Sequence, residues 1–370
     1  MKPCRMFLIL SLLLSALTSQ AQTKFWLGGD VSMLDEHQRA GVIYKGADGT
    51  VTDPLDLFKQ VGWNMLRVRL FVDPDNAPGR HHDQGVCQDL SYVVNLCQRL
   101  HRAGFEIMLD FHYSDTWADP AKQFMPQRWE LCDIDQLEEA VYDYTGNCLR
   151  TLILAGVKPA AIQVGNEITF GMMWPVGRVE PENDKNWPAL SLLLKAGVRA
   201  CREVCPESQV IIHTEKAGWW PATRGYYDRL KRYGVDYDII GLSYYPMWHG
   251  TIPNLGATLD SLAVRYPDKK VMIVETAWYY AYYGPPGKDE DFSHCEPATP
   301  EGQATFTHKL ITELYKHKNV TGLFWWYPEE NTYGRTLHGG HLNRGLFDHK
   351  TGCALPAFYE TERFVHFISP

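Results

Sequence analysis

The stretch AIQVGNE, residues 161–167, decides the predicted fold because it passes directly from an apolar run into polar and acidic side chains. Seven other short runs end in polar or aromatic residues in a similar way. Together the eight runs are Phe25–Val31, Met65–Phe71, Glu106–His112, Ala161–Glu167, Val210–Thr214, Ile239–Tyr245, Val271–Glu275 and Gly322–Trp326. They are too apolar to be solvated on one face, which is typical of parallel strands covered by helices. Each run is therefore predicted to be a strand.

The segments between these runs have helical spacing. Residues 89–103 are an example, with apolar residues on one face and Gly104 placed to end the helix. Strand and helix alternating eight times indicate an α/β fold of the closed (β/α)8 TIM-barrel type. An open doubly wound sheet is the structural alternative, but Gly28-Gly29-Asp30 lacks the glycine spacing of a phosphate-binding loop. Since no repeat or linker divides the chain, we expect one catalytic domain over residues 22–370.

The first 21 residues have the pattern of a signal peptide. Lys2 and Arg5 precede an apolar run, and small residues follow it around Ala21. That run is shorter than the roughly 20 residues that span a bilayer, and no later segment is both long and uncharged enough. We therefore expect export to the periplasm or the outside of the cell, without a membrane span.

The charge balance excludes nucleic acid as a partner. The whole chain carries a formal net charge of −8. Removing residues 1–21 takes away Lys2 and Arg5 and no acidic residue, which leaves −10. A chain this acidic has no electrostatic attraction for a polyphosphate. We expect a monomer that acts on a neutral polysaccharide.

Two glutamates stand at the ends of predicted strands, where the chemistry of a barrel collects. Glu167 ends the fourth run after Asn166, and Glu275 ends the seventh. Hydrolysis of a glycosidic bond needs one carboxylic acid to protonate the leaving oxygen and a second carboxylate at the anomeric carbon. Glu167 and Glu275 are therefore predicted to be the catalytic pair, rather than structural glutamates in ion pairs or helix caps.

Several motifs resemble those of glycoside hydrolase family 53, the endo-β-1,4-galactanases of clan A. The most specific are MLDFHYSDTWADPAKQ (108–123) and IQVGNEITFGMMWPVG (162–177). The others are LRVRLFVDP (66–74), DIIGLSYYPMWHG (238–250), VMIVETAW (271–278) and GLFWWYP (322–328), so the resemblance covers nearly the whole mature chain. It implies a retaining endo-hydrolase that needs no cofactor for its chemistry.

The resemblance also implies individual roles. Glu167 would be the acid/base, Glu275 the nucleophile, and Asn166 would bind the 2-hydroxyl of the sugar. Trp326 would form the floor under the sugar at the cleavage point, as apolar sugar faces stack on aromatic rings. One tyrosine of the adjacent pair Tyr244 and Tyr245 would donate a hydrogen bond to the nucleophile. The two side chains alternate in direction, and the sequence does not show which of them faces the site.

Other strand ends supply candidate substrate-binding residues. Arg67 and Arg69 share one face of their strand and would keep Glu275 ionised, although one of them could equally form a structural ion pair. His112 is predicted to reach the site as a hydrogen-bond donor, with a buried structural histidine as the alternative. Trp117 follows the third strand and is a candidate for the groove.

The loop after the seventh strand departs most from the family pattern. Some relatives bind calcium there, and Asp289 and Asp291 offer carboxylate ligands. A solvated acidic loop is the alternative.

The leading function is an endo-β-1,4-galactanase. A xylanase or mannanase of the same clan would use the same two glutamates. A non-catalytic polysaccharide-binding protein is the alternative from another class, but a binder has no need for paired carboxylates.

Overall fold

The computed structural model describes residues 25–82, 84–181, 183–282, 284–331 and 343–366. The expected signal peptide, residues 1–21, lies outside these ranges. No helix within them is long and apolar enough to cross a membrane.

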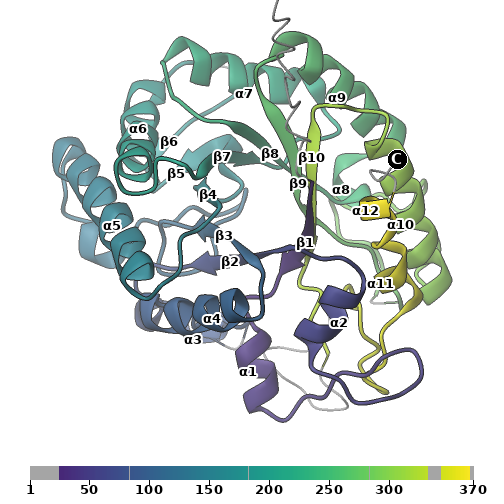
Figure 1. The fold of residues 1–370 in the computed structure, drawn as a ribbon. Helices are drawn as coiled ribbons and strands as arrows, with labels where there is room; N and C mark the ends of the chain where they lie inside the picture. The colour runs from purple at the N-terminus through teal and green to yellow at the C-terminus, as the bar shows by residue number, and fades with distance from the viewer. Residues whose placement is uncertain (1–24, 83, 182, 283, 332–342, 367–370) are drawn as a thin grey trace, which may run out of the picture.

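Eight parallel strands within the described ranges close into a barrel, which confirms the predicted TIM-barrel fold (Figure 1). Around the barrel the order is β1-β10-β9-β8-β7-β4-β3-β2. The strands are β1 (Trp26–Asp30), β2 (Met65–Leu70), β3 (Glu106–Phe111), β4 (Ala161–Val164), β7 (Gln209–Thr214), β8 (Ile239–Tyr244), β9 (Lys270–Thr276) and β10 (Val320–Trp326). The short strands β5 (Gly171–Met172) and β6 (Gly177–Arg178) form a separate antiparallel pair in the connection after β4.

Helices surround the barrel and connect its strands (Figure 1). They are α1 (Leu34–Arg39), α2 (Pro54–Gln60), α3 (Gly79–His82), α4 (Leu90–Arg102), α5 (Ile134–Leu154), α6 (Trp187–Val204), α7 (Trp220–Arg232), α8 (Pro246–His249), α9 (Ile252–Arg265), α10 (Pro300–Leu314), α11 (Pro356–Glu360) and α12 (Arg363–His366). Short 3-10 turns are η1 (Pro74–Asn76), η2 (Gln127–Trp129) and η3 (Ile168–Phe170).

The helix boundaries follow local sequence signals. Asp89 caps α4 by accepting a hydrogen bond from the Tyr92 N–H, and Gly104 follows the end of the helix with a φ of 85°. Asp133 and Gln136 form a reciprocal capping box at the start of α5. The helix predicted over residues 89–103 is therefore confirmed as α4, and α5 begins at a local signal of the same kind.

The interior of the barrel is apolar at one end and polar at the other. A compact cluster fills the half nearer the amino ends of the strands, and it consists of Met65, Met108, Ala161, Ile211, Ile239, Met272, Val274 and Phe324. Two residues further along several strands, the inward positions carry Arg67, Asp110, Gln163 and His213, all buried. Because buried polar groups need partners, this layer forms a connected network that supports the site above it.

Candidate active site

Glu275 reaches the barrel interior because β9 contains a register shift. Met272 and Val274 belong to the inner cluster, whereas Val271 and Ile273 belong to the outer one, so simple alternation would turn Glu275 outward. Against β8, however, Ile273 pairs with Leu242 and Glu275 pairs with the next residue, Ser243. The extra residue is a β-bulge, which re-aims the side chains that follow it. Val274 and Glu275 therefore both face inward.

The Glu275 carboxylate lies between a cation and a hydroxyl. Its Oε1 is 2.9 Å from Nη2 of Arg67, and its Oε2 accepts a hydrogen bond of 2.9 Å from the hydroxyl of Tyr245. Burial raises the pKa of Glu275 to about 7, while Arg67 and the Tyr245 hydroxyl oppose this rise. Both of these contacts favour the ionised form.

Glu167 lies in a different environment. It lies two residues after Gly165, which has a φ of 87°. The backbone of Glu167 itself is in the left-handed region, with φ 49° and ψ 51°. A non-glycine residue in this region is uncommon and is often found at functional sites. Its Oε1 accepts a hydrogen bond of 2.6 Å from Ser243. Burial, followed by the charges of Glu275 and Glu215, raises the pKa of Glu167 well above its usual value.

The pKa of Glu167 is raised more strongly than that of Glu275, so Glu275 is the first of the two to ionise as the pH rises. Arg67 faces Glu275, whereas no ion pair joins Glu167 to any cation in the described ranges. Each carboxylate also disfavours ionisation of the other, so a single proton shared by the pair is favoured on Glu167. This asymmetry gives one acid and one carboxylate, which is the pair that glycoside hydrolysis requires.

Arg67 connects Glu275 to the polar layer of the barrel. Its Nη1 is 2.7 Å from Oδ2 of Asp30, and its Nη2 is 2.7 Å from Oδ2 of Asp110. Nη2 also lies 2.8 Å from Oδ1 of Asn166, and Nε lies 3.3 Å from Oε1 of Gln163. The planar guanidinium has five N–H donors in a fixed fork, so one residue can orient several groups at once.

Arg69 forms a structural ion pair, which is the alternative role predicted for one of the two arginines. It lies 2.9 Å from Oδ1 of Asp30, and its guanidinium is 4.4 Å from the centre of the Trp117 ring. No contact joins it to Glu275 among the described residues. Arg67 therefore contacts the candidate nucleophile, and Arg69 forms the structural ion pair.

His112 lies behind the site and contacts neither glutamate. Its Nδ1 accepts a hydrogen bond from the Ala118 N–H, so its Nε2 carries the proton and lies 3.1 Å from Oδ2 of Asp110. Its ring also packs edge-on against Trp117. His112 is therefore the buried histidine of the alternative interpretation, and its inclusion among the substrate-binding residues is corrected, because it donates to the Asp110 that contacts Arg67.

The side chains of the two adjacent tyrosines point in different directions and have different partners. Tyr245 bonds Glu275, whereas Tyr244 donates to the carbonyl of Gly250 and stacks on Phe306 of α10. Tyr244 is fully buried in the layer between the barrel and its helices. The inclusion of Tyr244 among the substrate-binding residues is therefore corrected, since the last residue of β8 points away from the site.

Aromatic rings and an arginine flank the glutamates. Trp326 is half-buried at the end of β10, and Trp248 is 44% exposed after β8. The guanidinium of Arg344 lies 4.9 Å from the Trp326 ring and 5.6 Å from the Trp248 ring. Trp325 points the other way, is buried, and donates to the Arg344 carbonyl. The Arg344 guanidinium also lies 5.8 Å from the Tyr245 ring, so Trp326, Trp248 and Tyr245 surround one cation.

Several functional neighbours were not predicted from the sequence: Asp30, Asp110, Gln163, His213, Ser243 and Arg344. Three of them, Asp110, Gln163 and His213, stand two residues after a member of the inner cluster and therefore on the inward face of their strands. The alternation of side chains along a strand would have found these three, whereas Arg344 lies in a loop and had no such signal.

The candidate calcium ligands remain apart from a ligand cluster. Oδ1 of Asp291 accepts from the Ser293 N–H, and Oδ2 lies 3.5 Å from His294. In the ranges that the structure describes, no group of three or more His, Cys, Asp or Glu side chains could hold a metal ion. The side chains of Asp289 and Asp291 alone do not fit a calcium site, and calcium in this loop stays a prediction.

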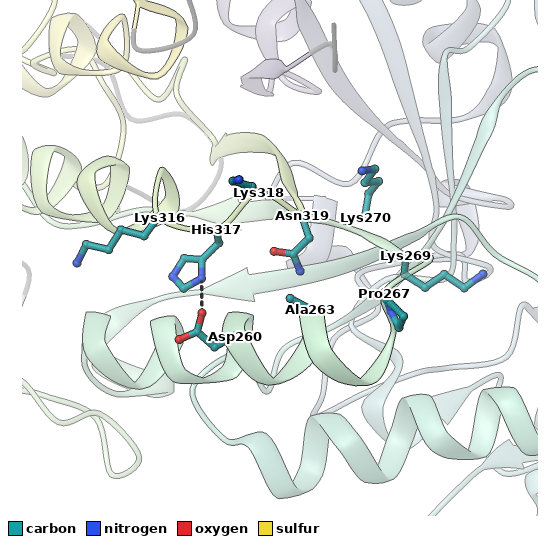
Figure 2. Close-up of a pocket in the computed structure, with 9 residues that line it drawn as sticks. All are labelled: Asp260, Ala263, Pro267, Lys269, Lys270, Lys316, His317, Lys318 and Asn319. Atoms are coloured by element: carbon teal, nitrogen blue, oxygen red, sulfur yellow. Dashed lines mark ion pairs between the residues drawn. The ribbon is translucent and has the colours of Figure 1, made fainter. Parts of the chain in front are cut away.

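A cavity of about 340 Å³ lies away from this site, before the amino ends of β9 and β10 (Figure 2). Its lining is Asp260, Ala263, Pro267, Lys269, Lys270, Lys316, His317, Lys318 and Asn319. His317 is paired with Asp260 at 3.1 Å, and the cavity has no aromatic ring other than this imidazole. Without paired carboxylates or stacking rings, it lacks what sugar cleavage requires.

A closed parallel barrel with two unlike glutamates at its carboxyl end defines the class of (β/α)8 glycoside hydrolases. The model of glycosyl hydrolase family 53 matches residues 26–360, and the chain belongs to this family. It is a glycoside hydrolase.

Curated relatives and solved structures agree with this assignment. The chain is 35% identical to an arabinogalactan endo-β-1,4-galactanase of Cellvibrio japonicus, with 91% of this chain and 90% of the relative covered. It is 32% identical to an endo-β-1,4-galactanase of Bacillus subtilis, over 82% and 70% of the two chains. The family 53 catalytic domain of Ignisphaera aggregans superposes with a TM-score of 0.82 at 31% identity, covering 94% of this chain and 98% of that one.

Proposed function

We propose that this protein is a retaining endo-β-1,4-galactanase in which Glu167 is the acid/base and Glu275 the nucleophile. The observation that carries the mechanism is the unlike surroundings of the two glutamates. Arg67 and Tyr245 both contact the Glu275 carboxylate, whereas among the described residues the Glu167 carboxylate accepts a hydrogen bond from the Ser243 hydroxyl alone and has a raised pKa.

In the first step, Glu275 attacks the anomeric carbon while Glu167 gives its proton to the departing glycosidic oxygen. A bond forms between the sugar and Glu275, and the bond to the leaving chain breaks. Arg67 and Tyr245 hold the attacking carboxylate in place. Oδ1 of Asn166 accepts from Arg67 and one Nδ2 hydrogen goes to the Ala118 carbonyl, which supports the proposal that the second Nδ2 hydrogen binds the 2-hydroxyl.

In the second step, Glu167 is ionised and removes a proton from a water molecule that attacks the same carbon. The bond to Glu275 breaks, and Glu167 regains the proton with which it began. Two inversions give a product with the configuration of the substrate.

The substrate is proposed from the relatives, because the site geometry alone fits any retaining β-glycosidase. The 35% identical relative of Cellvibrio japonicus is named for its action on arabinogalactan. Solved xylanases and mannanases also share the barrel, but at 13–15% identity they support the fold alone. Galactose has an axial 4-hydroxyl, so a β-1,4-galactan chain bends at each linkage, and Trp326, Trp248 and Arg344 would line a curved groove.

Analysis of products from four polysaccharides tests this proposal. We expect rapid internal cleavage of unbranched β-1,4-galactan to short oligosaccharides, and negligible cleavage of xylan, mannan or cellulose. A site that bonds one hydroxyl orientation rejects the epimer because its own polar groups are left unpaired. Equal rates on xylan and galactan, or release of galactose alone from chain ends, would contradict the proposal.

We further propose that the protein is exported and acts as a monomer on polysaccharide outside the cytoplasm. The basic and apolar pattern of residues 1–21 supports export. Sequencing the amino terminus of the exported protein, with cleavage expected after Ala21, tests it.

A further inference from the structure

One oxygen of Glu167 is bonded and the other is free. Oε1 accepts from the Ser243 hydroxyl at 2.6 Å. Oε2 makes no hydrogen bond or ion pair to any residue in the described ranges, and the side chain is half-buried. Only Oε2 is therefore left to meet a substrate oxygen.

Ser243 also touches His213, which is buried in the polar layer of the barrel. Nε2 of His213 lies 2.8 Å from Oγ of Ser243. Burial and the charge of Arg67 hold the pKa of His213 well below its usual value, so the ring is neutral and carries one proton. The nitrogen that carries this proton decides the direction of the hydrogen bonds to Ser243 and Glu167.

Two donors point at the other ring nitrogen. Nδ1 of His213 lies 3.0 Å from Nε2 of Gln163 and 3.3 Å from the backbone N–H of Glu167. The Gln163 amide cannot be reversed, because its nitrogen donates to Asp110 and its oxygen accepts from Arg67. Nδ1 therefore faces N–H groups from two residues.

One acceptor competes with these donors. Oδ1 of Asn166 is 3.0 Å from Nδ1 of His213, but it also accepts from Arg67 at 2.8 Å. Its amide is fixed by donation from Nδ2 to the Ala118 carbonyl. The Gln163 amide nitrogen also lies 3.2 Å from Oδ1 of Asn166 and 3.3 Å from the Gly165 carbonyl, but Nδ1 of His213 at 3.0 Å is nearer than either. Two donors against one acceptor that is already bonded favour the His213 proton on Nε2.

We propose that His213 and Ser243 are positioning residues that keep the transferable proton of Glu167 on Oε2. Nε2–H of His213 donates to Oγ of Ser243, which leaves the Ser243 hydrogen to donate to Oε1 of Glu167. A hydrogen on Oε1 would meet the hydrogen of Ser243. The acid proton is thus held on the oxygen that is free to reach the glycosidic bond.

The same chain stabilises the ionised form. When Oε2 gives its proton to the leaving oxygen, the new carboxylate keeps the hydrogen bond from Ser243, and neither Ser243 nor His213 gains or loses a proton. When water later returns a proton to Oε2, the starting arrangement is restored. The proposal rests on the proposed acid/base role of Glu167, but not on the identity of the sugar.

The first test is Ser243→Ala, with Ser243→Thr as the matched variant that keeps a hydroxyl. The acidic side chains that act on Glu167, namely Glu275, Glu215 and Asp119, are unchanged in both variants. Loss of a hydrogen bond to a carboxylate raises its pKa, so the basic limb of the activity profile should move up by about one pH unit in Ser243→Ala. Ser243→Thr should keep the basic limb of the unaltered protein.

The second test is His213→Gln, alone and combined with Ser243→Ala. If His213 acts through Ser243, the basic limb should move in the same direction, and the double variant should show no shift beyond that of Ser243→Ala. Additive shifts would overturn the proposal, as would an unmoved basic limb in Ser243→Ala together with a lower melting temperature, which is the result of a merely structural role.

A third measurement needs no substrate. Nitrogen NMR of ¹⁵N-histidine-labelled protein, with His213→Gln used to assign the signal, should show a neutral ring protonated on Nε2. Protonation on Nδ1 would overturn the proposal even if galactan is cleaved. A correct tautomer in a protein that does not cleave galactan would instead show that the proposed substrate is wrong.

Discussion

Arg67 and Glu275 form a buried ion pair across the barrel, with 2.9 Å between Nη2 and Oε1. Their strands, β2 and β9, are not neighbours, because β1 and β10 lie between them. The pair therefore spans the lumen rather than a strand interface, and Arg67 also holds Asp30 and Asp110. One side chain thus links the candidate nucleophile to the polar layer below it.

Removal of this cation should damage both folding and activity. In Arg67→Met, the carboxylates of Asp30 and Asp110 lose a buried partner, and we expect the free energy of unfolding to fall by about 3–5 kcal/mol. Arg265→Met is the control, because Arg265 is exposed and its solvent-screened pair with Asp228 should contribute little to stability. Denaturant unfolding of the two variants measures the difference, and equal losses would contradict the assignment.

The two adjacent tyrosines give a matched pair of variants. In Tyr245→Phe, Glu275 loses a hydrogen bond that favours its ionised form, so its pKa rises and the acidic limb of activity should move up by about one pH unit. In Tyr244→Phe the lost bond is to the Gly250 carbonyl, and only a stability loss of about 1 kcal/mol is expected. An acidic limb that moves in Tyr244→Phe and not in Tyr245→Phe would reverse the assignment.

The roles of the glutamates are separable by chemical rescue. Glu275→Ala should lose turnover, and azide should restore some activity by forming a glycosyl azide of inverted configuration. Glu167→Ala should keep activity on substrates with good leaving groups, which need no acid, and azide should then give a product of retained configuration. Near-normal activity of both variants on polysaccharide would show that neither residue is catalytic.

The proposed double displacement predicts the stereochemistry and the shape of the pH profile. A retaining enzyme holds its two carboxyl groups about 5–5.5 Å apart and releases the β-anomer first. Activity should fall at low pH as Glu275 is protonated and at high pH as Glu167 is ionised, with apparent pKa values that belong to the coupled pair. Proton NMR of the first product decides the matter, because an α-anomer would exclude retention.

Calcium in the loop after β9 is testable by chelation. If Asp289 and Asp291 hold the ion, excess chelator should lower the melting temperature, because a ligand bound only by the folded state stabilises it. Asp291→Asn should then melt at the chelated temperature with or without calcium. Identical melting curves of the unaltered protein in calcium and in chelator would favour the solvated loop.

The architecture and the candidate pair could be predicted from the sequence because both depend on local patterns. The apolar run of residues 161–164 and the helical spacing of residues 90–102 each specify one element without reference to the rest of the chain. Eight repeats of that alternation leave few folds other than a closed barrel. Glu167 and Glu275 stood out because acidic residues directly follow apolar strands.

The direction of side chains at the strand ends depends instead on pairing with neighbouring strands. Period two places Glu275 on the outer face, and only the bulge against β8 turns it inward beside Val274. In β8 the extra residue is absent, so the side chains keep alternating beyond Ser243, which contacts Glu167. Tyr245 therefore faces the site and Tyr244 faces away from it. A single strand read alone contains no information on such register shifts.

The pairing of polar side chains across the lumen is likewise a tertiary property. Arg67 meets Glu275 over 208 positions of sequence, and Ser243 meets Glu167 over 76. These contacts exist because barrel closure brings the carboxyl ends of β2, β4, β8 and β9 to one mouth, where burial obliges each polar group to find a partner. The sequence by itself singled out the two candidate glutamates, whereas closure of the barrel decided which of them contacts Arg67 and which accepts a hydrogen bond from Ser243.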